Sequence, residues 1–146
     1  DTGINDIVTF TENPNSSIGL RIVFAIQSFD LFMNNPILGV GTGDIKSEYE
    51  KVVRPEYKKL VTPNNPHNQY LMTASSLGLL GLSILLLMFF LSYTYSDFRG
   101  KAITIGFMMI CVAESYLWRS NTSFLYIYFI AIFSQRQSFL FSSTIK

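Results

Sequence analysis

The 146-residue chain is 49% hydrophobic and only 14% charged, with a formal net charge of +1. Ordinary soluble domains carry about 25% charged residues, so this is the composition of a membrane protein. The near-neutral charge provides no basic surface of the kind that binds nucleic acid. The single cysteine, Cys111, lies in an apolar run, where a small buried hydrophobic residue is the expected role.

The chain starts at Asp1 and has no basic segment followed by a short apolar one, so the sequence shows no signal peptide. We expect it to be the C-terminal part of a longer multi-span protein.

After a polar, turn-rich segment, residues 17–33 are predicted to form an amphipathic helix. Arg21 and Asp30 interrupt its apolar face, so we expect a helix on the membrane surface or packed on a bundle, and not a crossing. Asn34-Asn35-Pro36 ends the helix. The face repeats every 3.6 residues and comprises Ile18, Ile22, Ala25, Ile26, Phe29, Phe32 and Met33.

Glycines and charges fill the segment that follows. Gly39, Gly41 and Gly43 predict a tight turn, because no βαβ pattern surrounds them to make a nucleotide-binding loop. Residues 44–60 carry charges of both signs, including Arg54, and predict a water-exposed loop or short helix.

Three membrane helices are predicted in the rest of the chain, at about 71–95, 102–118 and 122–141. The connector 97–101 is basic on balance, so the positive-inside rule makes it cytoplasmic. Residues 1–70 then form a loop region on the outer face, and the C-terminus is cytoplasmic. The predicted fold is an all-α polytopic membrane helix bundle with a helical loop region on its outer face.

The only histidine, His67, lies near the start of residues 61–96, which contain no Asp, Glu, Lys or Arg. Histidine is the side chain best suited to accept a proton near neutral pH. At a membrane–water boundary, such a base would act on a substrate that comes partly from lipid and partly from water. The alternative is an interfacial histidine at the level of the lipid head groups.

Arg21 is the second candidate, because a guanidinium fits phosphate oxygens with a fork of donors. A contact with lipid head groups is the alternative. Glu114 lies in an apolar run with Arg119 five residues on, and a structural ion pair is expected there. No Cys, His or carboxylate residues cluster with metal-ligand spacing, so we expect no metal and no cofactor.

The spacing of His67-Asn68, nine residues, Gly78, two residues, Gly81 resembles the signature of the O-antigen ligase and O-antigen polymerase superfamily. Upstream, Asn35-Pro36-Ile37-Leu38-Gly39-Val40-Gly41 after an arginine helix resembles the same family's turn. Downstream, Glu114 and Arg119 are similar to the polar pair near its C-terminal helices. The resemblance extends over roughly residues 17–134.

The resemblance implies an inverting, metal-independent glycosyltransferase of the bacterial inner membrane. It would transfer a glycan from undecaprenyl pyrophosphate to a sugar hydroxyl of lipid A–core on the periplasmic face. His67 would assist deprotonation of the acceptor, and Arg21 would bind the pyrophosphate. Four further residues are expected to bind substrate, namely Asn68, Arg54, Gly78 and Gly81, although helix packing alone is an alternative role for the two glycines.

Other functions share these features. An O-antigen polymerase uses the same donor chemistry with a lipid-linked repeat unit as acceptor, and a protein O-oligosaccharyltransferase is a further variant. In a transporter fragment, His67 and Glu114 would line a path near the bilayer midplane. The enzyme instead requires His67 and Arg21 to meet at one outer-face cavity.

Overall fold

The computed structural model describes residues 17–43, 45–53 and 65–143, and within these ranges it is all-helical with no strand. This confirms the predicted all-α class. The elements in chain order are α2 (Ser17–Asn34), α3 (Ile45–Val52), α4 (Gln69–Tyr95), α5 (Phe98–Ala113), the short 3₁₀ helix η2 (Tyr116–Trp118) and α6 (Ser120–Ser143).

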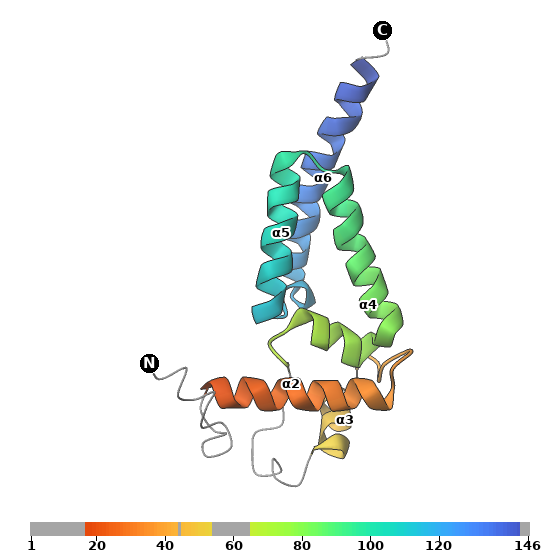
Figure 1. Ribbon diagram of the computed structural model, residues 1–146, viewed down its shortest axis with the longest axis vertical. Coiled ribbons are helices and arrows are strands. Elements are labelled where there is room, and N and C mark those ends of the chain that lie inside the picture. The colour runs from red at the N-terminus through yellow and green to blue at the C-terminus, as the bar shows by residue number, and fades with distance from the viewer. Residues whose placement is uncertain (1–16, 44, 54–64, 144–146) are drawn as a thin grey trace.

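The later part of α4 runs alongside α5 and α6, and α2 lies crosswise at one end of these three helices (Figure 1). The connection between α4 and α5 is at the opposite end of the bundle. Among the described residues, one helix, Gln69–Tyr95, is long and apolar enough to cross a membrane by length and composition.

The expected continuous helix over 71–95 is wrong in one respect, because α4 breaks at Gly78, whose backbone is non-helical (φ 65°, ψ −162°). Residues 69–77, which we call the arm, run in a different direction from residues 79–95 (Figure 1). The loop after α2 fills the break and satisfies the backbone groups that the two half-helices leave unpaired. Its four hydrogen bonds are Val40 N–H to Ser75 O (3.0 Å), Gly41 N–H to Ser76 O (2.8 Å), Leu79 N–H to Pro36 O (2.7 Å) and Leu80 N–H to Ile37 O (3.3 Å).

Two glycines make this contact possible. Gly39 and Gly78 both have positive φ, and each packs against the backbone of the other segment. A Cβ on Gly39 would lie 2.4 Å from the carbonyl carbon of Ser76, and one on Gly78 would lie 2.3 Å from the carbonyl oxygen of Ile37. The turn predicted around Gly39 is thus confirmed, and its function is to dock against α4.

The helix predicted at residues 17–33 is confirmed as Ser17–Asn34. Its packed face is different from its apolar stripe, since Phe29 and Met33 are more than half exposed. Ser28 allows close packing and shares a 2.6 Å hydrogen bond with the hydroxyl of Tyr49 on α3. The buried residues of α2 are Gly19, Val23, Gln27, Ser28 and Leu31.

The bundle core is formed by Leu85, Phe89, Cys111 and Tyr126, which join α4, α5 and α6. Cys111 is fully buried, as the sequence predicted.

The bounds of α5 and α6 differ from the predicted 102–118 and 122–141. α5 starts at Phe98 because the Asp97 carboxylate caps it by accepting the N–H of Gly100 at 3.0 Å. It ends at Ala113, where Glu114 adopts an extended backbone. A 3₁₀ turn then leads into α6, which begins at Ser120.

Candidate functional site

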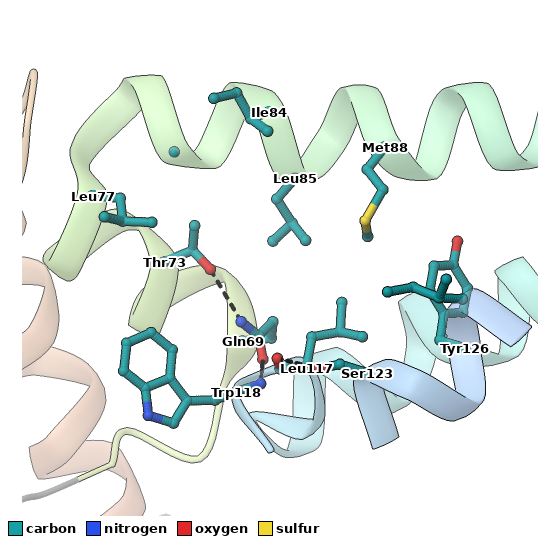
Figure 2. A pocket seen from close by; sticks show the side chains of 12 residues that line it. Gln69, Thr73, Leu77, Ile84, Leu85, Met88, Leu117, Trp118, Ser123 and Tyr126 are labelled. Atoms are coloured by element: carbon teal, nitrogen blue, oxygen red, sulfur yellow. Dashed lines mark hydrogen bonds between the residues drawn. The ribbon is translucent and has the colours of Figure 1, made fainter. Parts of the chain in front are cut away.

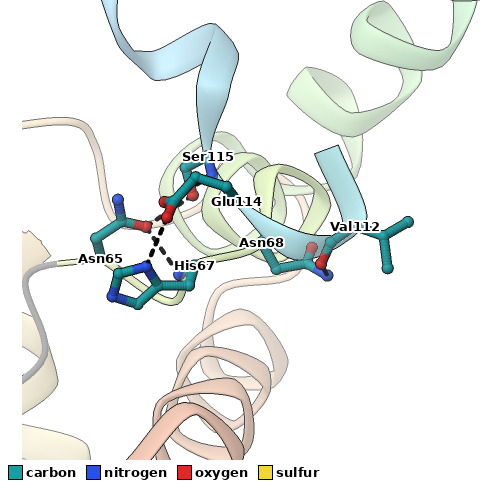
Figure 3. Close-up of polar contacts among 6 residues, drawn as sticks. All are labelled: Asn65, His67, Asn68, Val112, Glu114 and Ser115. Carbon is teal, nitrogen blue, oxygen red and sulfur yellow. Dashed lines mark hydrogen bonds and ion pairs between the residues drawn. The ribbon is translucent and has the colours of Figure 1, made fainter. Parts of the chain in front are cut away.

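The start of α4 is tied to the end of α5 through Asn68. Its Oδ1 accepts the N–H of Leu71 at 3.0 Å and caps α4, while its Nδ2 donates to the carbonyl of Val112 at 2.9 Å (Figure 3). This side chain therefore fixes the residue next to His67 relative to two helices. One N–H of its amide is not used by these two contacts.

His67 has a left-handed backbone, with φ of 51°. In the described part of the chain it is the single residue other than glycine whose φ is positive. Its N–H donates to Oδ1 of Asn65 at 2.9 Å. The same oxygen accepts the hydroxyl of Ser115 at 2.7 Å (Figure 3). Side-chain contacts from two separate segments thus hold the histidine in an uncommon conformation.

The His67 imidazole contacts a carboxylate, with 2.9 Å between Nδ1 and Oε2 of Glu114. The other carboxylate oxygen, Oε1, accepts the N–H of Ser115 at 3.1 Å. Burial raises the pKa of Glu114, but the hydrogen bonds from His67 and Ser115 and the charges of His67 and Arg119 outweigh it and hold the pKa below its usual range. Since the ionised carboxylate only accepts, Nδ1 is the ring nitrogen that donates to it, and in a neutral imidazole Nε2 is then the nitrogen that accepts a proton.

A cavity of about 220 Å³ lies between α2, the start of α4 and the end of α5. Arg21 from α2 and His67 both line it, although they are far apart in the sequence. Arg21 is exposed, and no ion pair joins it to another of the described residues. We call this space the Arg21–His67 cavity; its other lining residues are Ile18, Ile22, Ala25, Pro66, Asn68, Leu71, Val112 and Ala113.

The O-antigen ligase family model matches residues 2–86, more than half of the chain and including both Arg21 and His67. The chain belongs to the O-antigen ligase family. Members of this family are membrane-associated, glycosyltransferase-like ligases of lipopolysaccharide biosynthesis. No curated protein and no solved structure matches the chain.

Other site residues predicted for this O-antigen ligase family member are not among those that line the Arg21–His67 cavity. Arg54 lies outside the described residues. Gly78 is at the break in α4. Glu114 was expected to pair with Arg119, but among the described residues its carboxylate contacts His67, and Arg119 affects it through its charge alone.

Gly81 lines a second cavity, of about 270 Å³, between α4 and the start of α6 (Figure 2). One end is polar, because Gln69 donates to Thr73 Oγ1 at 3.1 Å and accepts the N–H of Trp118 at 3.1 Å. The remaining wall is largely aliphatic, formed by Leu77, Ile84, Leu85, Met88, Leu117 and Ile127.

Two residues of the site, Asn65 and Ser115, were not predicted from the sequence. Asn65 had a usable signal, because asparagine side chains often accept the backbone N–H two residues on, here that of His67. Ser115 had none, since its importance comes from the tertiary approach of the α5–η2 turn to the start of α4.

Proposed function

We propose that this chain is the catalytic portion of an O-antigen ligase that transfers a glycan from undecaprenyl pyrophosphate to a sugar hydroxyl of lipid A–core. The reaction would take place on the periplasmic face of the bacterial inner membrane. The observation that carries the proposal is that Arg21 and His67 line one cavity. Transfer from a pyrophosphate to a hydroxyl needs an anion-binding cation and a proton acceptor at the same place.

In the proposed reaction, Nε2 of His67 takes the proton of the acceptor hydroxyl while the hydroxyl oxygen attacks the anomeric carbon. The attack comes from the side opposite the pyrophosphate, so the configuration inverts. The bond between the anomeric carbon and the pyrophosphate oxygen breaks, and its electron pair stays on that oxygen. Glu114, at 2.9 Å from Nδ1, stabilises the imidazolium that forms.

Arg21 is proposed to hold the departing pyrophosphate. Its planar guanidinium can donate two parallel hydrogen bonds to phosphate oxygens and stays charged throughout the reaction. Because pyrophosphate is a weakly basic leaving group, this cation replaces a strong general acid and a divalent metal in the proposal. Arg54, outside the described residues, is proposed to add positive potential.

The donor is proposed to use both cavities. Asn68 lines the Arg21–His67 cavity and has one amide N–H left to donate to the donor. The aliphatic second cavity, which Gly81 lines, suits part of the donor's hydrocarbon chain. Gly78 is proposed to contribute through the break in α4, which sets the arm between the two cavities.

Residues 79–95, α5 and α6 are proposed to cross the membrane. Residues 79–95 are about 25 Å long as a helix, close to the ~30 Å of a bilayer core. The start of α5, which contains Arg99 and Lys101, lies at the end of the bundle opposite α2 (Figure 1). The positive-inside rule makes that end cytoplasmic. The Arg21–His67 cavity is then periplasmic.

This arrangement favours an enzyme over a transporter, whose polar groups lie near the midplane of the membrane. Here Arg21, His67 and Glu114 gather where α2 crosses the end of the bundle. A polymerase would use the same donor site with a different acceptor, so the choice of acceptor is part of the test.

The test is transfer by the purified full-length protein, with lipid A–core or a lipid-linked repeat unit as acceptor, together with complementation of a ligase-deficient strain. His67→Gln and His67→Asn should transfer glycan about 10²–10⁴-fold more slowly, because neither side chain is a base near neutral pH. His67→Asn is the better matched variant, since asparagine tolerates the left-handed backbone. Transfer by His67→Asn at close to the wild-type rate would exclude the proposed base.

A further inference from the structure

His67 belongs to a closed polar network of four residues, Asn65, His67, Glu114 and Ser115 (Figure 3). The imidazole contacts the Glu114 carboxylate, the carboxylate accepts the N–H of Ser115, and the Ser115 hydroxyl donates to Asn65. The Asn65 amide oxygen closes the network by accepting the N–H of His67. The histidine is thus held at both its backbone and its ring.

Asn65 and Ser115 do not line the Arg21–His67 cavity, so neither is placed to touch substrate there. Ser115 is fully buried, and its hydroxyl is 2.7 Å from the Asn65 oxygen. A left-handed backbone is unfavourable for a residue other than glycine and persists only where the surroundings enforce it. These two side chains supply that enforcement at His67.

We infer that Asn65 and Ser115 are positioning residues that set the direction of His67 Nε2 for proton transfer. The inference rests on the proposed role of His67 as the base. The acceptor oxygen of Asn65 holds the backbone N–H of His67, and the Ser115 hydroxyl holds that oxygen in place. Without them, the ring samples orientations in which Nε2 does not meet the acceptor hydroxyl.

Asn65→Ala removes the acceptor that both contacts share, so it should lower kcat about 10- to 100-fold with little change in KM. Asn65→Asp keeps an oxygen acceptor at the same place and should recover most of the rate. Ser115→Ala should cause a smaller loss, since Asn65 can still accept the N–H of His67. Asn121→Ala, an exposed change at the start of α6, is the matched control and should leave kcat unchanged.

The deciding measurement repeats the alanine changes in the His67→Ala background, using purified full-length protein and both substrates. Residues that act only through His67 can cause no further loss of the residual rate there. Melting temperatures of the same variants in detergent show whether a loss comes from the fold.

The outcomes separate the inference from the proposed function. Loss of kcat from Asn65→Ala in the wild-type background alone, with rescue by Asn65→Asp, supports the positioning role. An unchanged kcat in Asn65→Ala, or a further fall of the residual rate when His67 is already absent, overturns it while leaving the proposed function intact. If His67→Ala itself transfers glycan at the wild-type rate, the proposed base is wrong and the inference falls with it.

Discussion

Replacing Gly78 by alanine tests the break in α4. The change should lower the stability of the protein if the helix is broken there and raise it if the helix is continuous. In a continuous apolar helix, Gly→Ala is favourable by about 0.8–1.0 kcal/mol. In this structure Gly78 has φ of 65° and ψ of −162°, a region open essentially to glycine alone. An added Cβ would also lie 2.3 Å from the carbonyl oxygen of Ile37.

The cost follows from the contacts around the break. Forcing alanine into that backbone costs about 1–3 kcal/mol. Relieving the clash moves the loop away and weakens the hydrogen bonds from Leu79 to Pro36 and from Leu80 to Ile37, each contributing roughly 1 kcal/mol. We therefore expect Gly78→Ala to destabilise the protein by about 3–5 kcal/mol.

The assay is the melting temperature of the purified full-length protein in detergent, which we expect to fall by roughly 10 °C. Gly106→Ala is the matched control, because Gly106 lies within α5 and an added Cβ there would meet nothing within 4 Å. It should leave the melting temperature unchanged or slightly higher. A Gly78→Ala protein that melts at or above the wild-type temperature would show that α4 is continuous.

Three further predictions concern the site and its orientation. Arg21→Lys keeps the charge but loses the planar fork, so transfer should fall steeply at an unchanged protein level, whereas Arg99→Lys at the start of α5 should be neutral. Equal activity of both variants would reduce the role of Arg21 to that of a general positive charge. In a cysteine-free background, Ser47→Cys should react with an impermeant thiol reagent from the periplasm, and Phe98→Cys only after the inner membrane is permeabilised; the reverse pattern would remove the cavity from the periplasmic side. The lowered pKa of Glu114 means that its ionised form stabilises the fold at pH values above the ordinary glutamate range, and that this contribution disappears as the pH falls through the lowered pKa. Glu114→Gln should accordingly lower the melting temperature at pH 7 but have progressively less effect below about pH 4. An effect on the melting temperature that is equally large at pH 7 and in this acidic range would contradict the pairing of Glu114 with His67.

The helix α2 could be predicted closely because its signals are local. A 3.6-residue apolar period and the Asn34-Asn35-Pro36 stop give its position within a residue of the observed Ser17–Asn34. Which of its faces packs could not be predicted in the same way. Ser28 is buried because it bonds to Tyr49, a partner on another helix that periodicity does not reveal.

The break in α4 has no local signal in the sequence, since the segment on both sides of Gly78 is charge-free and contains no proline. Glycine alone does not cause it, because Gly81 lies three residues further on and keeps helical geometry. The break needs a partner that supplies hydrogen bonds to both half-helices, and the loop around Gly39 does so. It is a tertiary feature that only the pairing of two glycine motifs could have indicated.

The partner of Glu114 was missed for a related reason. Pairing it with Arg119 assumes that one helix continues through both residues, but α5 ends at Ala113. Once the helix stops, sequence separation no longer sets which side chains meet. The Glu114 carboxylate is then free to turn toward His67 on the segment before α4, at 2.9 Å.

The observed geometry gives a physical reason for the spacing between His67-Asn68 and Gly78. The nine residues between them are the arm, 69–77, which is anchored at one end by Asn68 and at the other by the docked loop. With both ends fixed, the length of the arm determines how His67 is presented relative to α2 and therefore to Arg21. One residue more or less would rotate that presentation by about 100° around the helix axis. The spacing thus sets the distance and the direction of His67 relative to Arg21. Gly78, at the end of the arm, acts on the site through backbone geometry.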